Sequence, residues 1–460
     1  MRRRILAALV VLTALATTSP ASAAVAEPTA AVEQKATADR QAAADRTATA
    51  GQKVAAAVFP RAVINEDFPD PDVIQVNGTW YAYSTNNGRG HVPTASAPSP
   101  EGPWTIRGDA MPGGPSAGWA QPGRTWAPDV HPNPDGSFTL TYTAWHKSSG
   151  RQCIGVATAS SPLGPFSPVG SQPLICPLNL GGAIDANTFV ANDGTRYLLW
   201  KNDGNAIGVN STLWLTRTTN NGTALTGGNT ALISSSGVIE APDLVQRGSQ
   251  YVLFYSGGSY TGCEYLTSYA VAPSLSGPWT TAYRSLMTTA SFDNHVCGPG
   301  GADFTNDKVF LHGWVNGSRH LYVADLGWAN DYPVVRGSRV RTEAERGTLN
   351  NCRVRTGAAG ASGGAVAAYI DFADSWVQNT FYAPRAGSYT LWVGYANGSG
   401  GTASHGVVVN GNSQGSVSYP VTGWDNWRQT SVSVTLNAGW NTIRLTKGNA
   451  YAEVDYFELQ

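Results

Sequence analysis

Three acidic residues with the chemistry of a hydrolytic site stand just ahead of short apolar segments, far apart along the chain. They are Asp70 in FPDPDV, Asp185 in IDANTF and Glu240 in IEAPDL. Carboxyl groups that share a partly desolvated pocket repel one another, so one can stay a protonated acid while another is an ionised base. Hydrolysis of a glycosidic bond requires that division of roles. The three residues therefore predict such a site, provided that the fold brings them together.

Acidic residues at these places also have a simpler role, because Asp side chains cap turns and tie strands together. We favour this structural role for four further acids, Asp72, Asp129, Asp243 and Asp303. We favour the chemical role for the first three acids, because each of them stands at the mouth of a separate repeat of the chain.

The elements that must position these acids recur at a nearly constant spacing. Five strand pairs have second strands that begin at Trp80, Phe138, Tyr197, Tyr251 and Val309, about 57 residues apart. The turns APSPEGPW, ASSPLGPF and APSLSGPW recur with them. Antiparallel sheets repeated at a fixed period predict an all-β, five-bladed β-propeller over residues 59–340. A sandwich is the alternative, but it would not repeat its turn sequences at a fixed spacing.

The three acidic motifs, in this order, resemble those of glycoside hydrolase family 43, whose members are five-bladed propellers with an inverting mechanism. The resemblance covers about residues 61–340. It implies that Asp70 is the general base that activates water, that Glu240 is the general acid, and that Asp185 orients and modulates that acid. The chain departs from the family pattern at one position, where a histidine of the family normally holds an ion or water on the propeller axis. The fifth repeat has Gly301 in GPGGADF where many members carry a histidine, and His295 is expected nearby.

Aromatic and amide side chains near the acids are expected to form the sugar site, because sugars stack on aromatic rings and are held by hydrogen bonds. Trp126, directly before APD, is the best candidate for the stacking platform, and a role in the core is its alternative. Phe68, Asn187 and His146 are further candidates.

Residues 341–460 predict a second domain, a β-sandwich of the jelly-roll type, because their strands alternate apolar and polar residues. The order of its motifs, EAE, GSYTLWVGYAN, TGWDNW, NAGWNTIRL and VDYFEL, resembles carbohydrate-binding modules of families 6 and 35. Its sugar site is expected in the loops that hold Trp424 and Asn449.

A cation site is also expected in this module, whereas catalysis needs no cofactor. Glu343 and Glu345 are two residues apart on the expected first strand, so their side chains lie on the same side of it. Asp455 lies in the last strand, which neighbours the first in such a sandwich. Three carboxylates would repel unless a hard cation such as Ca²⁺ joined them, and the resemblance also implies structural calcium here. The alternative is two solvated acids near an unrelated one.

The chain termini and composition bear on compartment and partners. Three arginines, the apolar run 5–16 and the small residues 21–23 predict a signal peptide over residues 1–23 and secretion. The apolar run is too short for a membrane anchor. Residues 24–58 are expected to be a disordered leader. With 30 Lys+Arg against 31 Asp+Glu, the chain lacks the positive charge that nucleic-acid binding requires.

Five cysteines suit an oxidising compartment, but at least one must be unpaired. On sequence proximity we expect Cys153 to pair with Cys176 and Cys263 with Cys297, which leaves Cys352.

The sequence thus predicts a secreted, monomeric, inverting exo-glycosidase that acts on plant cell-wall polysaccharide and binds neither nucleic acid nor membrane. We favour an α-L-arabinofuranosidase acting on arabinan or arabinoxylan. A β-xylosidase or an exo-β-1,3-galactanase is the alternative within the family. A propeller that binds glycans without cleaving them is the alternative from another class.

Overall fold

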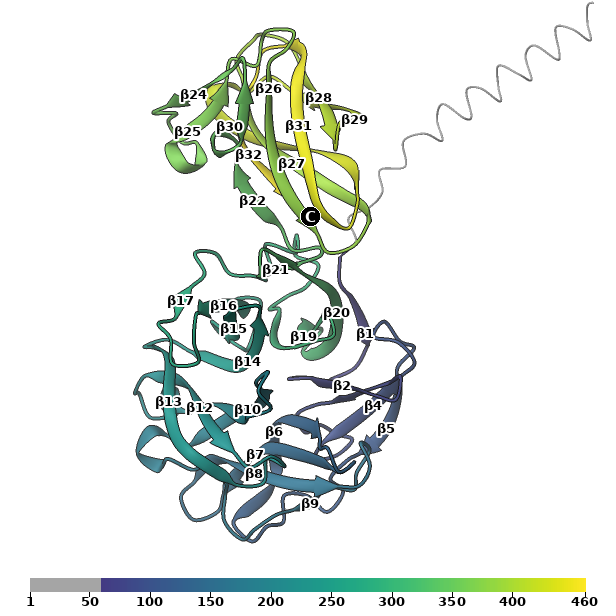
Figure 1. The fold of residues 1–460 in the computed structure, drawn as a ribbon, viewed down its shortest axis with the longest axis vertical. Coiled ribbons are helices and arrows are strands. Elements are labelled where there is room, and N and C mark those ends of the chain that lie inside the picture. Colours follow the sequence, from purple (N-terminus) through teal and green to yellow (C-terminus); the bar gives the residue numbers. More distant parts are fainter. Residues whose placement is uncertain (1–58) are drawn as a thin grey trace, which may run out of the picture. The chain divides into compact units, whose positions relative to one another are not determined.

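The computed structural model describes residues 59–460, which form seven antiparallel sheets and almost no helix (Figure 1). The predicted all-β class is therefore confirmed. The signal peptide predicted for residues 1–23 and the leader predicted for residues 24–58 lie outside the described residues. Within residues 59–460, no helix is both long enough and apolar enough to cross a membrane.

Four sheets of four consecutive strands follow one another along the chain. The first consists of β2 (Asp72–Val76), β3 (Thr79–Tyr83), β4 (Pro93–Ala97) and β5 (Thr105–Asp109), and the second of β6 (Ala120–Pro132), β7 (Phe138–His146), β8 (Arg151–Ala159) and β9 (Ser167–Pro168). The third consists of β10 (Ala183–Val190), β11 (Arg196–Asn202), β12 (Ser211–Thr218) and β13 (Leu225–Ser235), and the fourth of β14 (Ile239–Arg247), β15 (Gln250–Gly257), β16 (Leu266–Ala272) and β17 (Thr280–Thr281).

The fifth sheet is completed by the beginning of the described chain. It contains β18 (Gly300–Thr305), β19 (Lys308–Val315) and β20 (Ser318–Ala329), and β1 (Arg61–Ile64) pairs with β20, as does β21 (Tyr332–Val335). Arg61 lies opposite Val323 in this pairing. A strand from one end of the repeat array therefore closes the sheet at the other end.

The first strands of the five sheets form a closed ring. β2 contacts β6, β6 contacts β10, β10 contacts β14, β14 contacts β18, and β18 contacts β2 again. Apolar residues of neighbouring sheets share a core, such as Phe189 and Leu199 of the third sheet with Leu244 and Leu253 of the fourth. The five sheets are thus the blades of a propeller, and Figure 1 shows them around a common centre.

Buried aspartates link consecutive blades near the axis. The backbone N–H of Val130 donates to Asp72 (2.9 Å), that of Thr188 to Asp129 (3.0 Å), and that of Phe304 to Asp243 (2.7 Å). The N–H of Val73 donates in the same way to Asp303. Each of these carboxylates therefore satisfies a backbone donor of a neighbouring blade, which is the structural role expected for these four residues.

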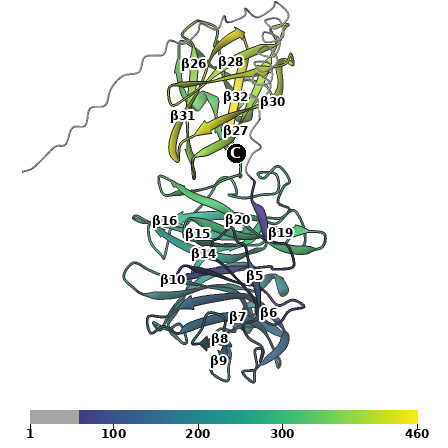
Figure 2. The same cartoon turned by 90° about the vertical axis from the view of Figure 1, so that its right-hand side faces the viewer.

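Residues 340–460 form two facing sheets. One contains β22 (Val340–Glu343), β24 (Arg353–Thr356), β25 (Ala365–Ala368), β27 (Gly387–Asn397), β30 (Gly423–Leu436) and β32 (Glu453–Leu459). The other contains β23 (Thr348–Asn350), β26 (Trp376–Ala383), β28 (Ala403–Val409), β29 (Asn412–Tyr419) and β31 (Gly439–Ala450). In Figure 2, β26 and β31 lie to the left of β30 and β32. The core between the sheets includes Phe381, Leu391 and Phe457, as expected for a sandwich.

Short features complete the fold. The described residues include four single-turn 3₁₀ helices, η1 (Leu178–Leu180), η2 (Gly204–Ala206), η3 (Ala344–Arg346) and η4 (Ser362–Gly364). Disulfides join Cys153 to Cys176 and Cys263 to Cys297, and Cys352 is a free thiol, so both predicted pairings are confirmed.

Candidate active site

Each blade begins at the axis with one residue in a left-handed backbone conformation. These residues are Asp70, Ala127, Asp185, Ala241 and Gly301, with φ of 50°, 38°, 55°, 48° and 54°. All five line one cavity on the axis. In four of the blades the pairing with the second strand shifts register beside this residue. Such bulges re-aim side chains, and in the third blade the bulge lies beside Asp185, which lines the cavity.

The strand register corrects one expectation about these positions. From the sequence, Asp185 and Glu240 are expected to be equivalent, because they stand three residues before Thr188 and Asp243. In the structure, however, Ile184 pairs with Lys201 as Glu240 pairs with Ser256. Asp185 is therefore the counterpart of Ala241, one residue further along. The cause is that Asn187, rather than Thr188, is the counterpart of Asp243 once the bulge is included. The N–H of Ala241 donates to Asp185 Oδ2 (2.9 Å), which ties the two blades together beside Glu240.

Asp70 has the surroundings of an ionised base. Its Oδ1 accepts from Arg319 Nη1 (3.0 Å), and its Oδ2 accepts from the hydroxyl of Thr85 (2.7 Å). Burial by itself raises the pKa of a carboxyl, but Arg319, His312 and Thr85 outweigh it and hold the pKa of Asp70 below its ordinary value. Asp70 is thus poised to accept a proton from a water.

A histidine lies at the axis, although it comes from an unexpected strand. His312 in β19 is fully buried, and its Nδ1 accepts from the N–H of Asp70 (3.1 Å). Burial lowers the pKa of His312 to about 3, so the ring is neutral. A Cβ at residue 301 would lie 2.6 Å from this ring, which explains the glycine. The expectation for His295 is wrong, because it stacks on Phe59 with ring centroids 3.6 Å apart.

Both oxygens of Glu240 have protein donors. The hydroxyl of Tyr265 donates to Oε1 (2.9 Å), and Lys201 Nζ donates to Oε2 (3.0 Å). Burial would lower the pKa of Lys201, but Glu240 and Asp185 reverse that effect and raise it. Burial and the nearby carboxylates raise the pKa of Tyr265 well above its ordinary value, so its hydroxyl remains a donor.

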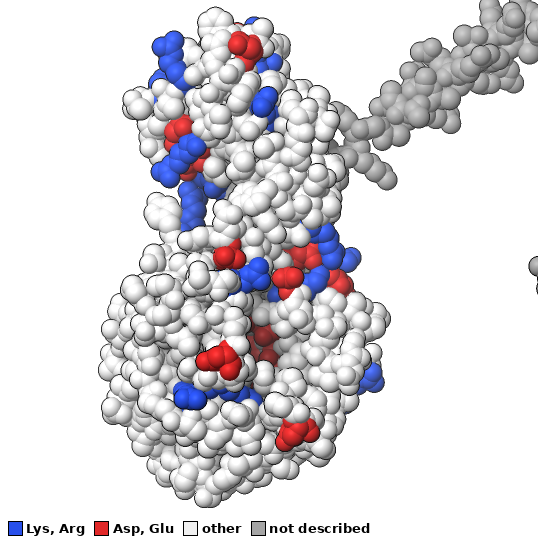
Figure 3. All heavy atoms as spheres, in the orientation of Figure 1, with Lys and Arg blue, Asp and Glu red and all other residues white. Residues whose placement is uncertain are grey.

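Asp185 lies close enough to the other two acids for their charges to interact. Burial and the neighbouring Glu240 raise the pKa of Asp185 to about 7, against the opposing effect of Lys201. Asp70 adds to the repulsion. The structure therefore brings the three predicted acids together. Figure 3 shows acidic atoms in a hollow at the middle of the propeller, on a face that is mostly uncharged.

The predicted sugar contacts fare differently. Phe68 is wrong as a stacking platform, because it is 1% exposed and packs in the core with Val73 and Phe310. Asn187 lines the axial cavity, and its Oδ1 is buried without a protein partner. Trp126 is half-buried in β6 beside Ala127, and His146 is half-buried at the end of β7 with Nδ1 2.7 Å from Ser149 Oγ. These three residues remain candidates.

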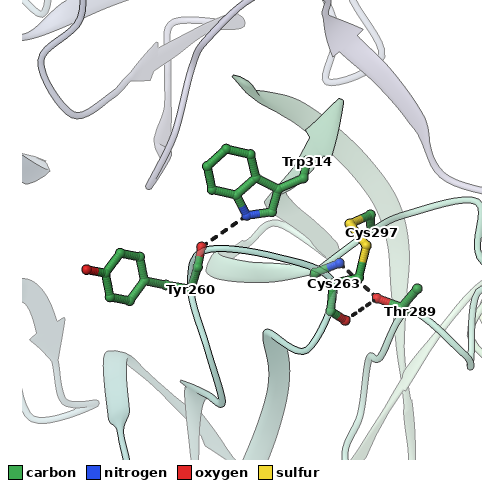
Figure 4. Close-up of a disulfide and its surroundings, with 6 residues drawn as sticks. Tyr260, Cys263, Thr289, Cys297 and Trp314 are labelled. Carbon is green, nitrogen blue, oxygen red and sulfur yellow. Dashed lines mark hydrogen bonds between the residues drawn. A yellow bond between two sulfur atoms is a disulfide. The ribbon is translucent and has the colours of Figure 1, made fainter. Parts of the chain in front are cut away.

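The loop that joins β15 to β16 lies on the same face as Glu240, because β15 runs antiparallel to β14 and ends there. The disulfide between Cys263 and Cys297 joins this loop to the segment before β18 (Figure 4). The hydroxyl of Thr289 donates to the carbonyl oxygen of Cys263 (2.6 Å) in the same cluster. The β15–β16 loop is therefore cross-linked to the segment that leads into the fifth blade.

The same loop presents an exposed aromatic ring. The side chain of Tyr260 is 52% exposed, while its carbonyl oxygen accepts from Trp314 Nε1 (3.0 Å), as Figure 4 shows. The guanidinium of Arg319 lies over the Trp314 ring, 5.8 Å from its centroid. Through these contacts, the loop is connected to the residue that binds Asp70.

Five residues that contact the acids were missed in the sequence, namely Thr85, Lys201, Tyr265, His312 and Arg319. Lys201 offered a signal, because a charged residue follows the apolar run YLLW in a strand of the propeller. His312 and Arg319 offered none, since they reach Asp70 from the opposite end of the repeat array.

The expectation that the sugar residues of the module lie in loops is wrong, because Trp424 is near the start of β30 and Asn449 near the end of β31. Trp424 is 44% exposed, and its ring centroid lies 5.1 Å from that of Tyr451. The amide of Asn449 accepts from Ser404 Oγ (2.8 Å) and donates to the carbonyl of Thr402 (3.2 Å). Trp424 thus offers a ring face, whereas Asn449 already has protein partners.

The predicted cation site is partly as expected. β22 and β32 are paired, so the strands of Glu343 and Asp455 are neighbours, but Glu345 lies in η3 because the strand ends at Glu343. Glu345 Oε2 and Asp455 Oδ1 are buried without partners. Burial, Glu343 and Glu345 raise the pKa of Asp455 to about 6. These carboxylate oxygens without hydrogen-bond partners are ligands of the type that Ca²⁺ prefers, so the residues fit a hard cation.

The spacing of these acids is nevertheless wider than in a finished site. Within residues 59–460, one trio of His, Cys, Asp or Glu has ligand atoms all within 4.8 Å, namely His146, Cys153 and Cys176. Two of its members are joined in a disulfide, so this trio is no metal centre. Glu343, Glu345 and Asp455 would have to draw together around an ion.

Comparison with protein families agrees with the geometry. Residues 59–319 match the model of glycosyl hydrolases family 43, and residues 340–460 match that of carbohydrate-binding module family 35. The chain therefore belongs to glycoside hydrolase family 43 and carries a family 35 module.

Individual relatives are more distant. A probable arabinan endo-1,5-alpha-L-arabinosidase C of Aspergillus flavus is 28% identical over 293 residues, which cover 56% of this chain and 88% of the relative. A thermostable family-43 glycoside hydrolase has a TM-score of 0.54 at 23% identity, covering 61% of this chain and 96% of that one. An endo-arabinase of Bacteroides thetaiotaomicron has a TM-score of 0.50 at 18% identity, covering 59% and 99%. These two structures support the fold.

Proposed function

We propose that this protein is a secreted, inverting glycosidase that cleaves α-L-arabinofuranosidic bonds in arabinan, acting from chain ends. The observation that carries the reaction type is the grouping of Asp70, Asp185 and Glu240 near the propeller axis, with Asp185 close enough to both other acids for their charges to interact. The name of the Aspergillus flavus relative, an arabinan endo-1,5-alpha-L-arabinosidase, supports arabinan as the substrate.

The proposed reaction is a single displacement. Asp70 takes a proton from a water, and the water oxygen attacks the anomeric carbon from the face opposite the leaving group. Glu240 gives its proton to the glycosidic oxygen as the bond to the anomeric carbon breaks. Asp185 holds the acid in place through the backbone of Ala241 and disfavours a second negative charge beside itself. One proton enters on Asp70 and one leaves from Glu240, so the site is reset by exchange with solvent.

Aryl glycosides test both the sugar and the catalytic nature of the propeller. We expect release of the aryl group from an aryl α-L-arabinofuranoside, with much slower release from the β-xyloside and the β-galactoside. Asp70→Ala should lose roughly 10²- to 10⁴-fold in kcat/KM on the arabinofuranoside. Full activity in Asp70→Ala would overturn its role as base, and no hydrolysis of any of these glycosides or of linear arabinan would favour the glycan-binding propeller.

The leaving group tests the acid. Glu240→Ala should depress hydrolysis of polysaccharide far more than that of an aryl substrate with a good leaving group, because the latter hardly needs a proton. Proton NMR of the freshly released sugar should show the β-anomer first, as inversion requires. Equal losses on both substrates would speak against Glu240 as the acid.

Internal cleavage of arabinan is the second candidate, because the relatives from Aspergillus flavus and Bacteroides thetaiotaomicron are named endo-acting enzymes. The products of linear arabinan separate the two modes. Arabinose as the main early product supports action from chain ends. A ladder of oligosaccharides with a rapid fall in viscosity supports internal cleavage.

For the module we propose that it binds polysaccharide through Trp424 and holds a structural Ca²⁺ through Glu343, Glu345 and Asp455. The exposed ring of Trp424 supports the first point, and the unsatisfied carboxylate oxygens support the second. Trp424→Ala should abolish retention on insoluble polysaccharide while hydrolysis of aryl glycosides is unchanged. Trp440→Ala, at another exposed indole of the module, is the matched control.

A further inference from the structure

Lys201 is a buried lysine that contacts the proposed general acid. Its side chain is 0% exposed, near the end of β11 in the third blade. Its Nζ lies 3.0 Å from Glu240 Oε2 and 3.8 Å from Asp203 Oδ1. Lysine is rarely buried unless its charge is paired. The neighbouring carboxylates therefore keep this buried amine in its charged ammonium form.

The groups that face this pair come from several elements. They are Asp185 of β10, Asp203 after β11, Tyr265 before β16, Asp70 before β2, and Arg151 of β8, which acts on Asp203. Besides Glu240, two carboxyl groups, Asp185 and Asp203, interact with Lys201, while the hydroxyl of Tyr265 bonds the other oxygen of Glu240. Lys201 supplies the positive charge that bonds Glu240 directly.

We infer that Lys201 is a positioning residue, which fixes one oxygen of the Glu240 carboxyl and sets how readily that carboxyl releases its proton. The inference rests on the proposed role of Glu240 as the general acid. When Glu240 gives its proton to the leaving oxygen, the O–H bond of the carboxyl breaks and a carboxylate remains. Lys201 stays protonated throughout and stabilises that carboxylate, without taking or giving a proton itself.

Lys201 and Asp185 must then act on Glu240 in opposite directions. A neighbouring cation favours the ionised carboxylate, whereas a neighbouring anion favours the protonated acid. Removing the cation should let Glu240 keep its proton to higher pH. Removing the anion should make Glu240 lose its proton at lower pH. The opposed signs distinguish this role from simple support of the fold.

The pH profile of kcat/KM on an aryl arabinofuranoside measures both effects. The alkaline limb should move up by about 1 to 3 pH units in Lys201→Met and down in Asp185→Asn, because a charge at this range shifts a carboxyl by that amount. The maximal kcat of Lys201→Met should fall, since the acid gives up its proton less readily. An unmoved or lowered alkaline limb in Lys201→Met would overturn the inference.

Two variants serve as controls. Lys308→Met removes another buried lysine with two carboxylate partners, Glu101 and Asp325, at the start of β19 away from the site. It should lower the thermal stability but leave the alkaline limb in place. Lys201→Arg keeps the charge and should restore the limb of the wild type, even where kcat stays low. If Lys201→Met does not fold, Lys201→Gln carries the same prediction.

A direct titration separates this inference from the choice of substrate. In protein labelled with ¹³C at glutamate carboxyls, the signal lost in Glu240→Gln identifies Glu240. Its titration midpoint should be higher in Lys201→Met than in the wild type, whichever glycoside the enzyme cleaves. An upward shift without arabinofuranosidase activity would contradict the proposed substrate alone. An unchanged midpoint with full arabinofuranosidase activity would contradict the role of Lys201 alone.

Discussion

At the scale of single residues, the proposed base and the proposed acid each have one cationic and one hydroxyl donor. Asp70 is bonded by a guanidinium and a hydroxyl, and both hold it as an anion. Glu240 faces an ammonium on one oxygen and a neutral hydroxyl on the other. The donors on the two carboxyls are thus of the same kinds, and what sets Glu240 apart is the neighbouring carboxyl of Asp185, which favours its protonated form.

Arg319 provides the first prediction. Arg319→Met removes the cation that holds the pKa of Asp70 low, so burial should raise that pKa by about 1 to 3 units. Because a base must be ionised to act, the acidic limb of the kcat/KM profile should move to higher pH. The alkaline limb should not move. A variant whose acidic limb coincides with that of the wild type would show that Arg319 does not tune Asp70.

The residues of this site were predictable to different degrees. Asp70, Asp185 and Glu240 stand in motifs that the sequence displays, because each precedes a strand of regular pattern. His312 was hidden, since it belongs to a second strand and reaches the axis over Gly301. Phe68 was misjudged because an aromatic residue beside an acidic motif serves the core as readily as a ligand.

At the scale of elements, a bulge at the head of four of the five blades sets the register of the first strand. Repeated turns and aromatic strands revealed the five blades, since a fixed period is visible in sequence. The one-residue offset between Asp185 and Glu240 was not visible, because the register of a bulged strand depends on its partner. Where a strand lies can therefore be predicted from its own residues, whereas its register depends on the strand with which it pairs.

The cross-linked loop provides the second prediction. Replacing Cys263 and Cys297 together by serine should cost about 2 to 4 kcal/mol of stability, because it frees a segment of 34 residues in the unfolded chain. KM for oligosaccharide should rise more than kcat falls, since Tyr260 is on the released loop. Denaturant unfolding and kinetics measure these effects. Replacing Cys153 and Cys176 is the control, expected to cost stability with the smaller change in KM.

The aspartates that link the blades provide the third prediction. Burial, opposed by bonds from Phe304 and Leu244, raises the pKa of Asp243 to about 7, against about 3.9 in an unfolded chain. Its contribution to stability is therefore full below about pH 4 and is lost as the pH rises to about 7. Asp243→Asn lacks that loss. The melting temperature of the variant, relative to that of the wild type, should therefore increase from pH 4 to pH 8.

The size of that gain should correspond to a few kcal/mol at most. A matched control is Asp193→Asn, which changes an aspartate in an exposed turn and should bring no such gain. A constant difference in melting temperature between Asp243→Asn and the wild type across the range would show that Asp243 keeps its charge without cost.

At the scale of the whole molecule, two kinds of β-domain follow each other in one chain. The sandwich was predictable because alternating residues mark half-buried strands. The position of Glu345 was not, because the end of a short strand depends on its neighbours, and here a 3₁₀ turn begins at Ala344.

Calcium provides the fourth prediction. Chelation should lower the melting temperature of the module in the intact protein, and adding Ca²⁺ should restore it, because a bound ion stabilises the folded state alone. Asp455→Asn should abolish this response. Calorimetry resolves the effect if propeller and module melt separately. A melting profile indifferent to both calcium and chelator would refute the cation site.

The pairing of β1 with β20 sets the order in which this protein can be made. The ribosome completes Arg61–Ile64 long before Ser318–Ala329, and at roughly 5 to 20 residues per second the interval lasts on the order of tens of seconds. Throughout that time the nascent propeller is an open arc, and β1 lacks its partner strand β20. Its two free edges are surfaces on which another unfinished chain can pair. Biosynthesis of this protein therefore depends on keeping unfinished copies apart until the ring closes.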